Sequence, residues 1–411
     1  MNKEIELLAP AGDLEKLKTA IDYGADAVYF GGEMFSLRAS AGNMNVDEIK
    51  KGLSYAHDKG KKGFLALNIY PHNEDIMPLK EYLNDIKDLD IDGFIVSDPG
   101  VITILKETIP DAELHLSTQA NMTNYATANF WKNQGIKRLV LARELTLTEI
   151  NEIRNNLPHD IDLEAFIHGA MCISYSGRCL LSNFMIERDA NRGQCAHPCR
   201  WNYSLVEEKR PGEYYPIEED SRGTYIMNSR DLCMINNIPD LINSGIRSFK
   251  IEGRMKSMYY VATVVRAYRM AIDAYLKEPE KYSVDGYWLT ELEKASHREF
   301  TTGFYFHKPD NKDQNYFTSA YSRTHEFIGV VIGYEEDSGN TIIEQRNKFC
   351  VGDKIEIFGP EAGHFEYFVE KMYNGDGEVI LSAPHPKETI KINFGRRFEN
   401  GNILRKKKEV I

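Results

Sequence analysis

The sequence predicts an α/β protein: a (β/α)8 TIM-like barrel with a cysteine-rich insertion after its seventh strand, followed by a small C-terminal β-barrel domain. Three observations lead to this prediction. Short apolar runs alternate eight times with longer amphipathic segments, four cysteines gather in the gap before the eighth run, and short alternating segments separated by Gly and Asp follow. A doubly wound open sheet is the alternative, because periodicity does not show whether a sheet closes.

Eight apolar runs are the candidate barrel strands. They are Ile5–Ala9, Ala27–Phe30, Gly63–Ile69, Gly93–Val96, Glu113–Leu116, Arg138–Leu141, Leu163–His168 and Arg247–Ile251. The segments between the first seven runs have helical spacing, as in Leu14, Leu17 and Ile21. A further helix is expected over Met258–Leu276, with Pro279 just beyond it as a stop signal.

The remaining chain divides into an insertion and a second domain. The insertion is expected at about 170–245, on the catalytic face, because the carboxyl ends of barrel strands form that face. We expect residues 1–300 to form the barrel domain, 301–324 a linker and 325–411 the β-barrel domain. The strands expected in this last domain are Ile328–Gly333, Thr341–Glu344, Lys354–Phe358, Glu366–Val369 and Glu378–Ser382.

The charge balance limits the partners of the chain. A net charge of −12 over 411 residues argues against indiscriminate coating of nucleic acid, although it allows a local basic site. Between positions 396 and 408 the chain carries six cationic residues and one acidic residue, Glu399. This segment indicates an RNA contact, and a solvated charged tail is the alternative. These cations are Arg396, Arg397, Arg405, Lys406, Lys407 and Lys408.

The N-terminal sequence lacks the pattern of a secretory signal, and the longest apolar stretch of the C-terminal third, Phe327–Tyr334, is too short to span a bilayer. We therefore expect a cytoplasmic protein without a membrane partner.

The cysteines are distributed unevenly. Four of the six fall within 28 residues, with six, fifteen and three residues between successive members: Cys172, Cys179, Cys195 and Cys199. In a reducing compartment such a cluster favours a metal or redox site over two disulfides. The spacing allows three alternatives, which are zinc, an iron–sulfur cluster, or neither of them. It excludes a radical-SAM loop, which needs three closely spaced cysteines. Cys233, beside Leu232 and Met234, is expected in the core.

The segment Glu164–Ser182, EAFIHGAMCISYSGRCLLS, resembles the signature of the collagenase-like peptidase family U32. Further stretches that resemble the family are Ala9–Gly12, Gly24–Tyr29, Arg188–Cys195, Cys199–Trp201, Gly223–Ser229, Lys250–Arg254 and, in its C-terminal β domain, Lys348–Asp353. Within the family, Arg210–Tyr214 and the residues after it most resemble the prephenate-dependent tRNA uridine hydroxylase branch.

This resemblance implies an activity, a cofactor and partners. The activity is hydroxylation of the wobble uridine of tRNA to 5-hydroxyuridine, with prephenate as the hydroxyl donor. The cofactor is a 4Fe-4S cluster held by Cys172, Cys179, Cys195 and Cys199, which makes the iron–sulfur assembly machinery a partner besides tRNA and the small dicarboxylate. The two alternatives are a peptidase and a non-catalytic RNA-binding factor with a structural cluster.

The peptidase alternative has little support in the residues. The sequence lacks the metalloprotease motif His-Glu-x-x-His and the serine-hydrolase motif Gly-x-Ser-x-Gly. A Cys172–His168 pair is therefore the remaining candidate for a protease site. Four clustered cysteines would make oxidation or metal capture compete with such a nucleophile.

Candidate substrate groups stand where the predicted strands end, because barrel chemistry comes from these positions. We expect Glu252, His168 and Arg143 to be catalytic. The expected substrate-binding residues are Arg178, Arg254, Gln119 and Asp98. Arginine suits the carboxylates of prephenate because its planar guanidinium binds them in a bidentate manner. The alternatives are a solvated helix start for Arg143–Glu144, a hydrogen-bonded core residue for His168 and a helix N-cap for Asp98.

Overall fold

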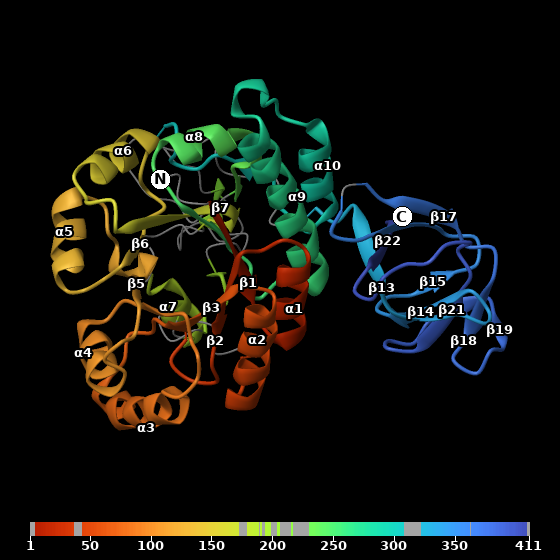
Figure 1. Ribbon diagram of the computed structural model, residues 1–411, viewed down its shortest axis with the longest axis horizontal. Helices are drawn as coiled ribbons and strands as arrows, with labels where there is room; N and C mark the ends of the chain where they lie inside the picture. Colours follow the sequence, from red (N-terminus) through yellow and green to blue (C-terminus); the bar gives the residue numbers. More distant parts are fainter. Residues whose placement is uncertain are drawn as a thin grey trace.

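The computed structural model describes residues 5–36, 43–171, 179–188, 190, 194–198, 204–205, 215–216, 230–307, 322–361 and 363–408. Its first part is a closed barrel of eight parallel strands (Figure 1). The strands are β1 (Glu6–Ala11), β2 (Ala27–Gly31), β3 (Lys62–Leu67), β4 (Gly93–Val96), β5 (Leu114–Leu116), β6 (Arg138–Val140), β7 (Asp162–Ala170) and β11 (Ser248–Ile251). Ser248 of β11 is in register with Glu6 of β1 and with Glu164 of β7, so the sheet closes and the open-sheet alternative is wrong.

Helices surround this barrel (Figure 1). They are α1 (Leu14–Asp22), α2 (Val46–Asp58), α3 (Ile76–Ile86), α4 (Pro99–Thr108), α5 (Tyr125–Asn133), α6 (Leu147–Asn155), α8 (Ile238–Asn243) and α9 (Met258–Lys277). Short polar side chains fix where several of them begin: Asp13, Asn45 and Thr146 accept a backbone N–H of the first turn. The boundaries of α9 agree with the predicted helix before Pro279.

The barrel interior combines apolar and charged side chains. Leu8, Phe64 and Ile95 form part of its buried apolar layer. In the same interior, fully buried Glu164 lies 2.6 Å from Lys250 Nζ and 3.3 Å from Arg138 Nη1. Arg138 also pairs with Glu6 at 2.6 Å, so that two acids balance two bases in a region with little solvent.

The end of β7 reaches beyond the barrel and carries additional strands. Strand β10 (Asp231–Cys233) pairs antiparallel with β7, placing Cys233 opposite His168, and β12 (Phe300–Thr301) pairs with β10. The described parts of the insertion also contain α7 (Leu181–Ile186) and the short pair β8 (Ser204–Leu205) and β9 (Tyr215–Pro216). The insertion therefore begins and ends beside the C-terminal mouth of the barrel.

The C-terminal domain is an antiparallel half-barrel around its own apolar core. Its eight-stranded sheet runs in the order β17 (Phe365–Phe368), β16 (Lys354–Phe358), β22 (Ile403–Lys407), β13 (His325–Glu335), β14 (Asn340–Gln345), β21 (Thr389–Ile392), β18 (Met372–Asn374) and β19 (Val379–Ile380). A two-stranded pair, β15 (Phe349–Cys350) and β20 (Ser382–Ala383), completes the described part. Buried residues alternate with more exposed ones in β14, which is the pattern that predicts a strand with one face on a core.

The two domains are joined by buried ion pairs. Arg266 of α9 and Arg405 of β22 both contact Glu291 of α10 (Gly286–Lys294), and all three side chains are at most 1% exposed. Lys294 Nζ lies 2.9 Å from Glu356 of β16, which also accepts from Arg405 Nε at 2.7 Å. The half-barrel therefore lies against α9 and α10 through charges that solvent hardly reaches (Figure 1).

Within the part of the chain that the structure describes, no helix combines the length and apolar character needed to cross a membrane.

Candidate functional site

The C-terminal mouth of the barrel is lined by short polar side chains at the ends of β3, β4 and β5. Asn68 Nδ2 donates to Ser117 Oγ at 3.3 Å, and Ser97 Oγ donates to the Asn68 carbonyl at 3.4 Å. Tyr70 OH donates to the Gln119 carbonyl at 2.9 Å, which fixes the backbone that carries the Gln119 side chain. These contacts link three neighbouring strand ends into one polar rim.

Asp98 follows β4 and caps α4. Its carboxylate accepts the Val101 N–H at 3.0 Å, and Pro99 occupies the first helical position. The structure thus gives Asp98 the N-cap role that the Asp-Pro-Gly sequence allows. Its predicted contact with substrate stays a prediction.

Arg143 follows β6 and is held by neutral groups. Its Nη1 donates to the Ala170 carbonyl at 3.0 Å, and its guanidinium lies 4.1 Å from the centre of the Phe166 ring. Among the described residues, no carboxylate forms an ion pair with it. A half-buried arginine fixed by a carbonyl and an aromatic face is suited to an anionic ligand.

Gln119 and Glu144 carry buried polar atoms at the same rim. Neither Gln119 Oε1 nor Glu144 Oε2 has a hydrogen-bond partner among the described residues. Burial raises the pKa of the Glu144 carboxyl above its usual range, although backbone N–H groups and the charge of Arg143 act in the opposite direction.

Glu252 follows β11 and is positioned from several sides. Its N–H donates to the His168 carbonyl at 2.9 Å, and its own carbonyl accepts from Tyr260 OH at 3.0 Å. Tyr29 OH lies 3.4 Å from Glu252 Oε2. A Cβ at Gly169, where φ is +109°, would stand 2.6 Å from the Glu252 carbonyl oxygen, so that this close approach requires glycine.

Arg254 is buried two residues further on, 4% exposed. Its Nη2 donates to Ser36 Oγ at 2.9 Å. Gly31 leaves room for the guanidinium, because a Cβ there would stand 2.7 Å from Arg254 Nη1. Arg254 thus lies at the base of the mouth beside the end of β2, whereas Arg143 lies across the barrel beside β7.

His168 lies inside the protein rather than at the surface of the mouth. It is 2% exposed and packs among the rings of Tyr260, Tyr268 and Phe300, with Tyr268 OH 3.4 Å from Nδ1. Burial, with further effects of Lys256 and His297, lowers the pKa of His168 to about 3. A neutral, packed imidazole corresponds to the core alternative, and its predicted catalytic role gains no support from this position.

Two of the four clustered cysteines are described. Cys179 and Cys195 are both partly exposed and free of disulfide bonds. The His197 N–H points at Cys195 Sγ at 3.4 Å, and Ser182 Oγ of α7 accepts the Ala196 N–H at 3.1 Å. Backbone N–H donation to sulfur and two accessible thiols are compatible with a thiolate-held cluster. Cys172, Cys199 and Arg178 lie outside the described residues.

Cys233 has a different environment. It is buried, 3.9 Å from Tyr268 OH, and burial raises the pKa of its thiol to about 11. The predicted core position of Cys233 is confirmed.

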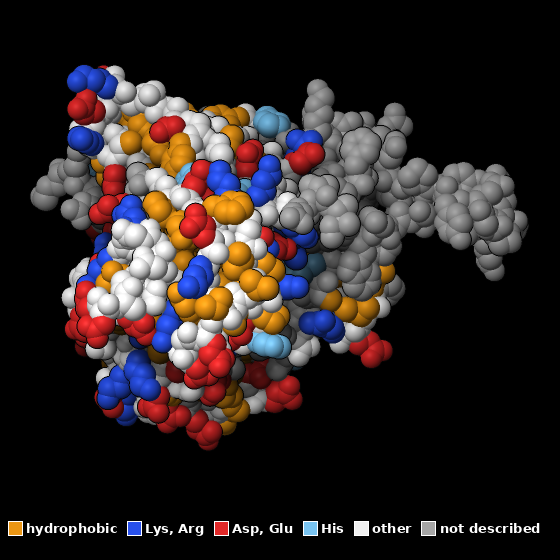
Figure 2. All heavy atoms as spheres, turned by 90° about the vertical axis from the view of Figure 1, so that its right-hand side faces the viewer, with side chains coloured by type: hydrophobic (Ala, Val, Ile, Leu, Met, Phe, Trp, Pro, Cys, Tyr) orange, Lys and Arg blue, Asp and Glu red, His pale blue; other side chains and the backbone are white. Residues whose placement is uncertain are grey.

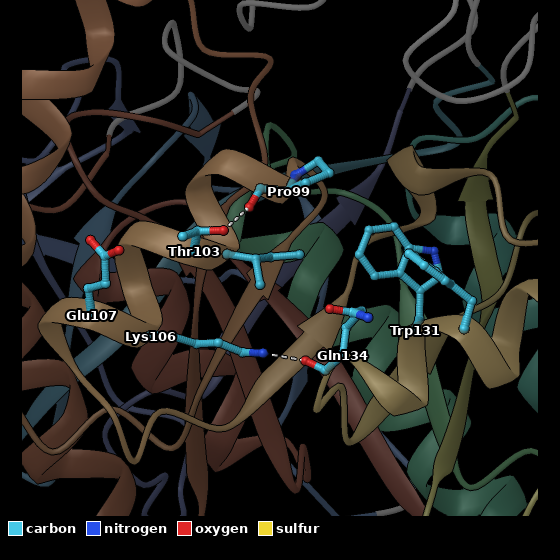
Figure 3. A pocket seen from close by; sticks show the side chains of 8 residues that line it. Pro99, Thr103, Lys106, Glu107, Trp131 and Gln134 are labelled. Atoms are coloured by element: carbon cyan, nitrogen blue, oxygen red, sulfur yellow. Dashed lines mark hydrogen bonds between the residues drawn. The ribbon is translucent and has the colours of Figure 1, made fainter.

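A groove of about 320 Å³ lies away from the mouth, between α4 and α5 (Figure 3). Its lining includes Ile102, Phe130 and Trp131, and Lys106 donates to the Gln134 carbonyl across it. The strand ends described above contribute nothing to this groove, so its position on the outer helices separates it from the candidate site.

The structure removes some of the six cations at the predicted basic end of the chain from solvent. Arg405 is fully buried in the domain interface, Lys406 pairs with Asp353 at 2.9 Å, and Arg397 pairs with Glu336 at 2.6 Å. Arg396, Arg397, Lys407 and Lys408 are exposed, and an RNA contact there stays a prediction. The burial of Arg405 could not be predicted, because a run of basic residues does not show which side chains of a strand face the core. On the face that carries the half-barrel, the described acidic, basic and hydrophobic side chains are intermixed (Figure 2).

A second group of ligand-type side chains lies at the domain interface. Glu291, Glu356 and His364 come close enough together to hold a metal ion. The two carboxylates already face Arg266, Arg405 and Lys294, so cationic side chains neutralise them without a metal.

The fold and site define a TIM-barrel protein whose mouth carries arginines and buried polar groups, and whose insertion after β7 carries two partly exposed cysteines. The sequence matches Peptidase family U32 over residues 12–315 and the Peptidase family U32 C-terminal domain over residues 323–405. The chain belongs to the U32 family, as the motifs of its sequence indicate.

Three relatives show the range of names in this family. The chain is 42% identical over 408 residues to tRNA hydroxylation protein P1 of Bacillus subtilis, covering 99% of this chain and 96% of that protein. It is 35% identical to 23S rRNA 5-hydroxycytidine C2501 synthase of Escherichia coli, covering 80% of this chain and 48% of that protein. It is 34% identical to Collagenase of Porphyromonas gingivalis, covering 90% of each.

Proposed function

We propose that this chain hydroxylates the wobble uridine of tRNA at C5, giving 5-hydroxyuridine. The observation that carries the proposal is the similarity, over almost the whole length of both chains, to a protein named for tRNA hydroxylation. A second relative is named for synthesis of a 5-hydroxypyrimidine in RNA, which is the same ring position. Since tRNA is the substrate, we expect the protein to act in the cytoplasm.

The hydroxyl donor in this proposal is prephenate, a dicarboxylate. Arg143 supports its binding because this guanidinium lacks a carboxylate partner in the described structure and is held rigidly by the Ala170 carbonyl and the Phe166 ring. Arg254, buried at the other side of the mouth, is the candidate for the second carboxylate. Two fixed cations on opposite sides would orient a molecule with two separated anionic groups.

The proposed cofactor is an iron–sulfur cluster held by Cys172, Cys179, Cys195 and Cys199. The partly exposed thiols of Cys179 and Cys195, which form no disulfide, and the His197 N–H at Cys195 Sγ fit this use. When bound, such a cluster supplies redox or Lewis-acid chemistry that side chains lack. Glu252, at the rim and fixed through its backbone by Tyr260, is the proposed group that holds or moves a proton beside the reacting base.

The collagenase relative makes a peptidase the alternative function. Cys195 Sγ lies 3.9 Å from His197 Nδ1, but this thiol is one of the four clustered cysteines, and the histidine of the predicted Cys172–His168 pair is poorly placed. His168 is neutral and packed between three aromatic rings, and burial disfavours its charged form. A cysteine protease needs an imidazole that accepts the thiol proton, so this histidine is poorly suited to that role.

Nucleoside analysis tests the proposed function. tRNA is isolated from a strain in which the gene is deleted and no second pathway to the same nucleoside exists, and its nucleosides are measured by mass spectrometry. We expect 5-hydroxyuridine and nucleosides derived from it to disappear and a plasmid copy to restore them. Unchanged 5-hydroxyuridine would overturn the proposal, whereas loss of the nucleoside in a prephenate-deficient strain fed aromatic amino acids would support the donor.

A further inference from the structure

The segment that leads from the barrel mouth into α5 contains no acidic residue. Asp and Glu account for 62 of the 411 residues, yet none of them lies between Leu114 and Arg143, which is the longest stretch of the chain without an acid. In a chain with a net charge of −12, a polyanion meets little local repulsion at such a segment. The charge distribution therefore favours an anionic partner on this side of the barrel.

Helix α5, within this segment, exposes an aromatic pair. Phe130 is 55% exposed, and its ring packs edge-on against Trp131 with the ring centres 5.2 Å apart. Both residues line the groove of about 320 Å³ between α4 and α5 (Figure 3). Exposed aromatic surface is stabilised when a flat apolar partner covers it, and unpaired bases of RNA stack on such rings.

A cation lies at the end of the same groove. Lys106 Nζ donates to the Gln134 carbonyl across it, and no acid of the described residues forms an ion pair with this ammonium. An ammonium has three hydrogens to donate, so two remain for a phosphate. The acid of the lining, Glu107, points away from Lys106 and Trp131 (Figure 3).

The groove lies outside the mouth but begins beside it. Pro99, which lines one end, directly follows Asp98 at the end of β4. From Pro99 to Lys106 the helix α4 rises about 10 Å, so that the groove leads from the rim down the outside of the barrel. Helices α4 and α5 lie on the side of the barrel away from the half-barrel (Figure 1). An RNA whose wobble base enters the mouth has its neighbouring nucleotides within reach of this groove.

We propose that the groove between α4 and α5 binds a nucleotide of the anticodon loop next to the wobble uridine. Its base stacks on the Phe130 ring with Trp131 as the wall, and its phosphate contacts Lys106. This inference rests on the proposed function and says where the substrate RNA lies on the protein.

Affinity for an anticodon stem-loop tests the groove. Anaerobically purified protein is titrated into a labelled stem-loop with uridine at the wobble position, and fluorescence anisotropy gives the dissociation constant. We expect Phe130→Ala to weaken binding by about 5- to 100-fold, because one stacked base is lost. Lys106→Ala should weaken binding and lower the slope of log affinity against log salt concentration by about 0.7, because one phosphate contact is lost.

Abasic stem-loops locate the stacked base. Each loop nucleotide outside the wobble position is replaced in turn by an abasic one, and wild type and Phe130→Ala are compared on every loop. At one nucleotide the two proteins should bind equally, because the base that stacks on Phe130 is already missing. The stem-loop should also quench tryptophan emission in the wild type, and Trp131→Phe should remove most of this quenching.

Phe368→Ala and Lys87→Ala are the matched controls. Phe368 is 59% exposed but lies in the half-barrel, and Lys87 is an exposed lysine at the end of α3 that also donates to one neutral oxygen. Both variants should bind as the wild type does, and circular dichroism melting confirms that every variant is folded.

The proposal is overturned if the wild type does not bind the stem-loop, or if folded Phe130→Ala and Lys106→Ala bind it as tightly as the wild type. It is also overturned if the effect of Phe130→Ala is the same on every abasic loop. A sedimentation coefficient that changes in Phe130→Ala while RNA affinity does not would assign the groove to a second copy of the chain instead.

Complementation separates this inference from the proposed function. If the wild-type gene restores 5-hydroxyuridine in the deletion strain but the groove variants bind the stem-loop normally, the groove is wrong and the function stands. If the wild-type gene fails to restore the nucleoside, the proposed function is wrong whatever the stem-loop affinities are.

Discussion

Arg405 donates from Nη2 to both carboxylate oxygens of Glu291, at 2.8 and 2.9 Å, and neither side chain is more than 1% exposed. The two residues are 114 positions apart and belong to different domains. Arg266 and Lys294 also contact this carboxylate. Glu291 is therefore the acid around which the barrel and the half-barrel are joined.

Glu291→Ala should destabilise the protein strongly. Arg266 would lose its acidic partner while staying buried, and an uncompensated buried charge costs about 3–5 kcal/mol of unfolding free energy. Urea denaturation followed by fluorescence measures this change, because Trp288 lies on the same helix. Glu278→Ala, which removes an exposed pair with Lys281, should change the unfolding free energy by less than about 1 kcal/mol. Equal effects of the two substitutions would contradict the central role of Glu291.

His168 should make the protein less stable as the pH falls. Burial lowers its pKa to about 3 in the folded state, whereas an unfolded histidine titrates near about 6.5. Between these values the unfolded chain binds a proton that the folded protein excludes, so stability falls with decreasing pH by up to about 1.4 kcal/mol per unit. Denaturation of His168→Gln between pH 6.5 and 4 should show a shallower slope than the wild type. The exposed residue His159 provides the control, since His159→Gln should keep the wild-type slope.

Substitution of the clustered cysteines should remove iron. Cys179→Ser and Cys195→Ser alter accessible thiols of the insertion, and we expect less bound iron and weaker visible absorbance after anaerobic purification. Cys350→Ser is the matched control, because Cys350 is also partly exposed but lies in the half-barrel. Cys233→Ala should also retain iron, because that thiol is in the core. Full iron content in Cys195→Ser would argue against this residue as a ligand.

Gly169→Ala should lower the free energy of unfolding by more than the positive φ of this position alone would cause. The new Cβ would stand 2.6 Å from the Glu252 carbonyl oxygen and 3.0 Å from Glu252 Cβ. We expect a loss of about 2–4 kcal/mol in unfolding free energy and reduced hydroxylation. Gly60 also has a positive φ, +66°, but a Cβ there would meet nothing within 4 Å, so Gly60→Ala should cost about 1 kcal/mol and leave hydroxylation intact. Similar losses for both variants would show that the contact with Glu252 is unimportant.

Much of the barrel could be predicted from local patterns. Each of the eight expected strands overlaps an observed one, since strands buried on both faces form short continuous apolar runs. The N-cap role of Asp98 was also predicted as an alternative, because a cap depends on residues within one turn. Short elements such as β10 and β12 were not predicted: two or three residues carry too little periodicity.

The site was predicted less completely. Position after a strand placed Gln119, Arg143 and Glu252 at one rim, because parallel barrel strands all end at the same face. It did not distinguish His168, whose side chain points into the aromatic core, from residues that face the mouth. The unsatisfied oxygen of Glu144 had no signal in the sequence, because solvent exclusion depends on how distant segments pack.

The sequence by itself determined the eightfold alternation of strands and helices, the second β domain, the U32 family and the separation of the six cysteines into a cluster of four and two isolated residues. Only the tertiary structure decided that the sheet closes, that Arg405 neutralises Glu291 instead of facing solvent, and that Arg143 lacks a carboxylate partner among the described residues. The physical reason is the distance along the chain over which each interaction acts. Periodicity and capping act within a few residues, whereas burial and charge pairing depend on side chains that meet only after the chain has folded.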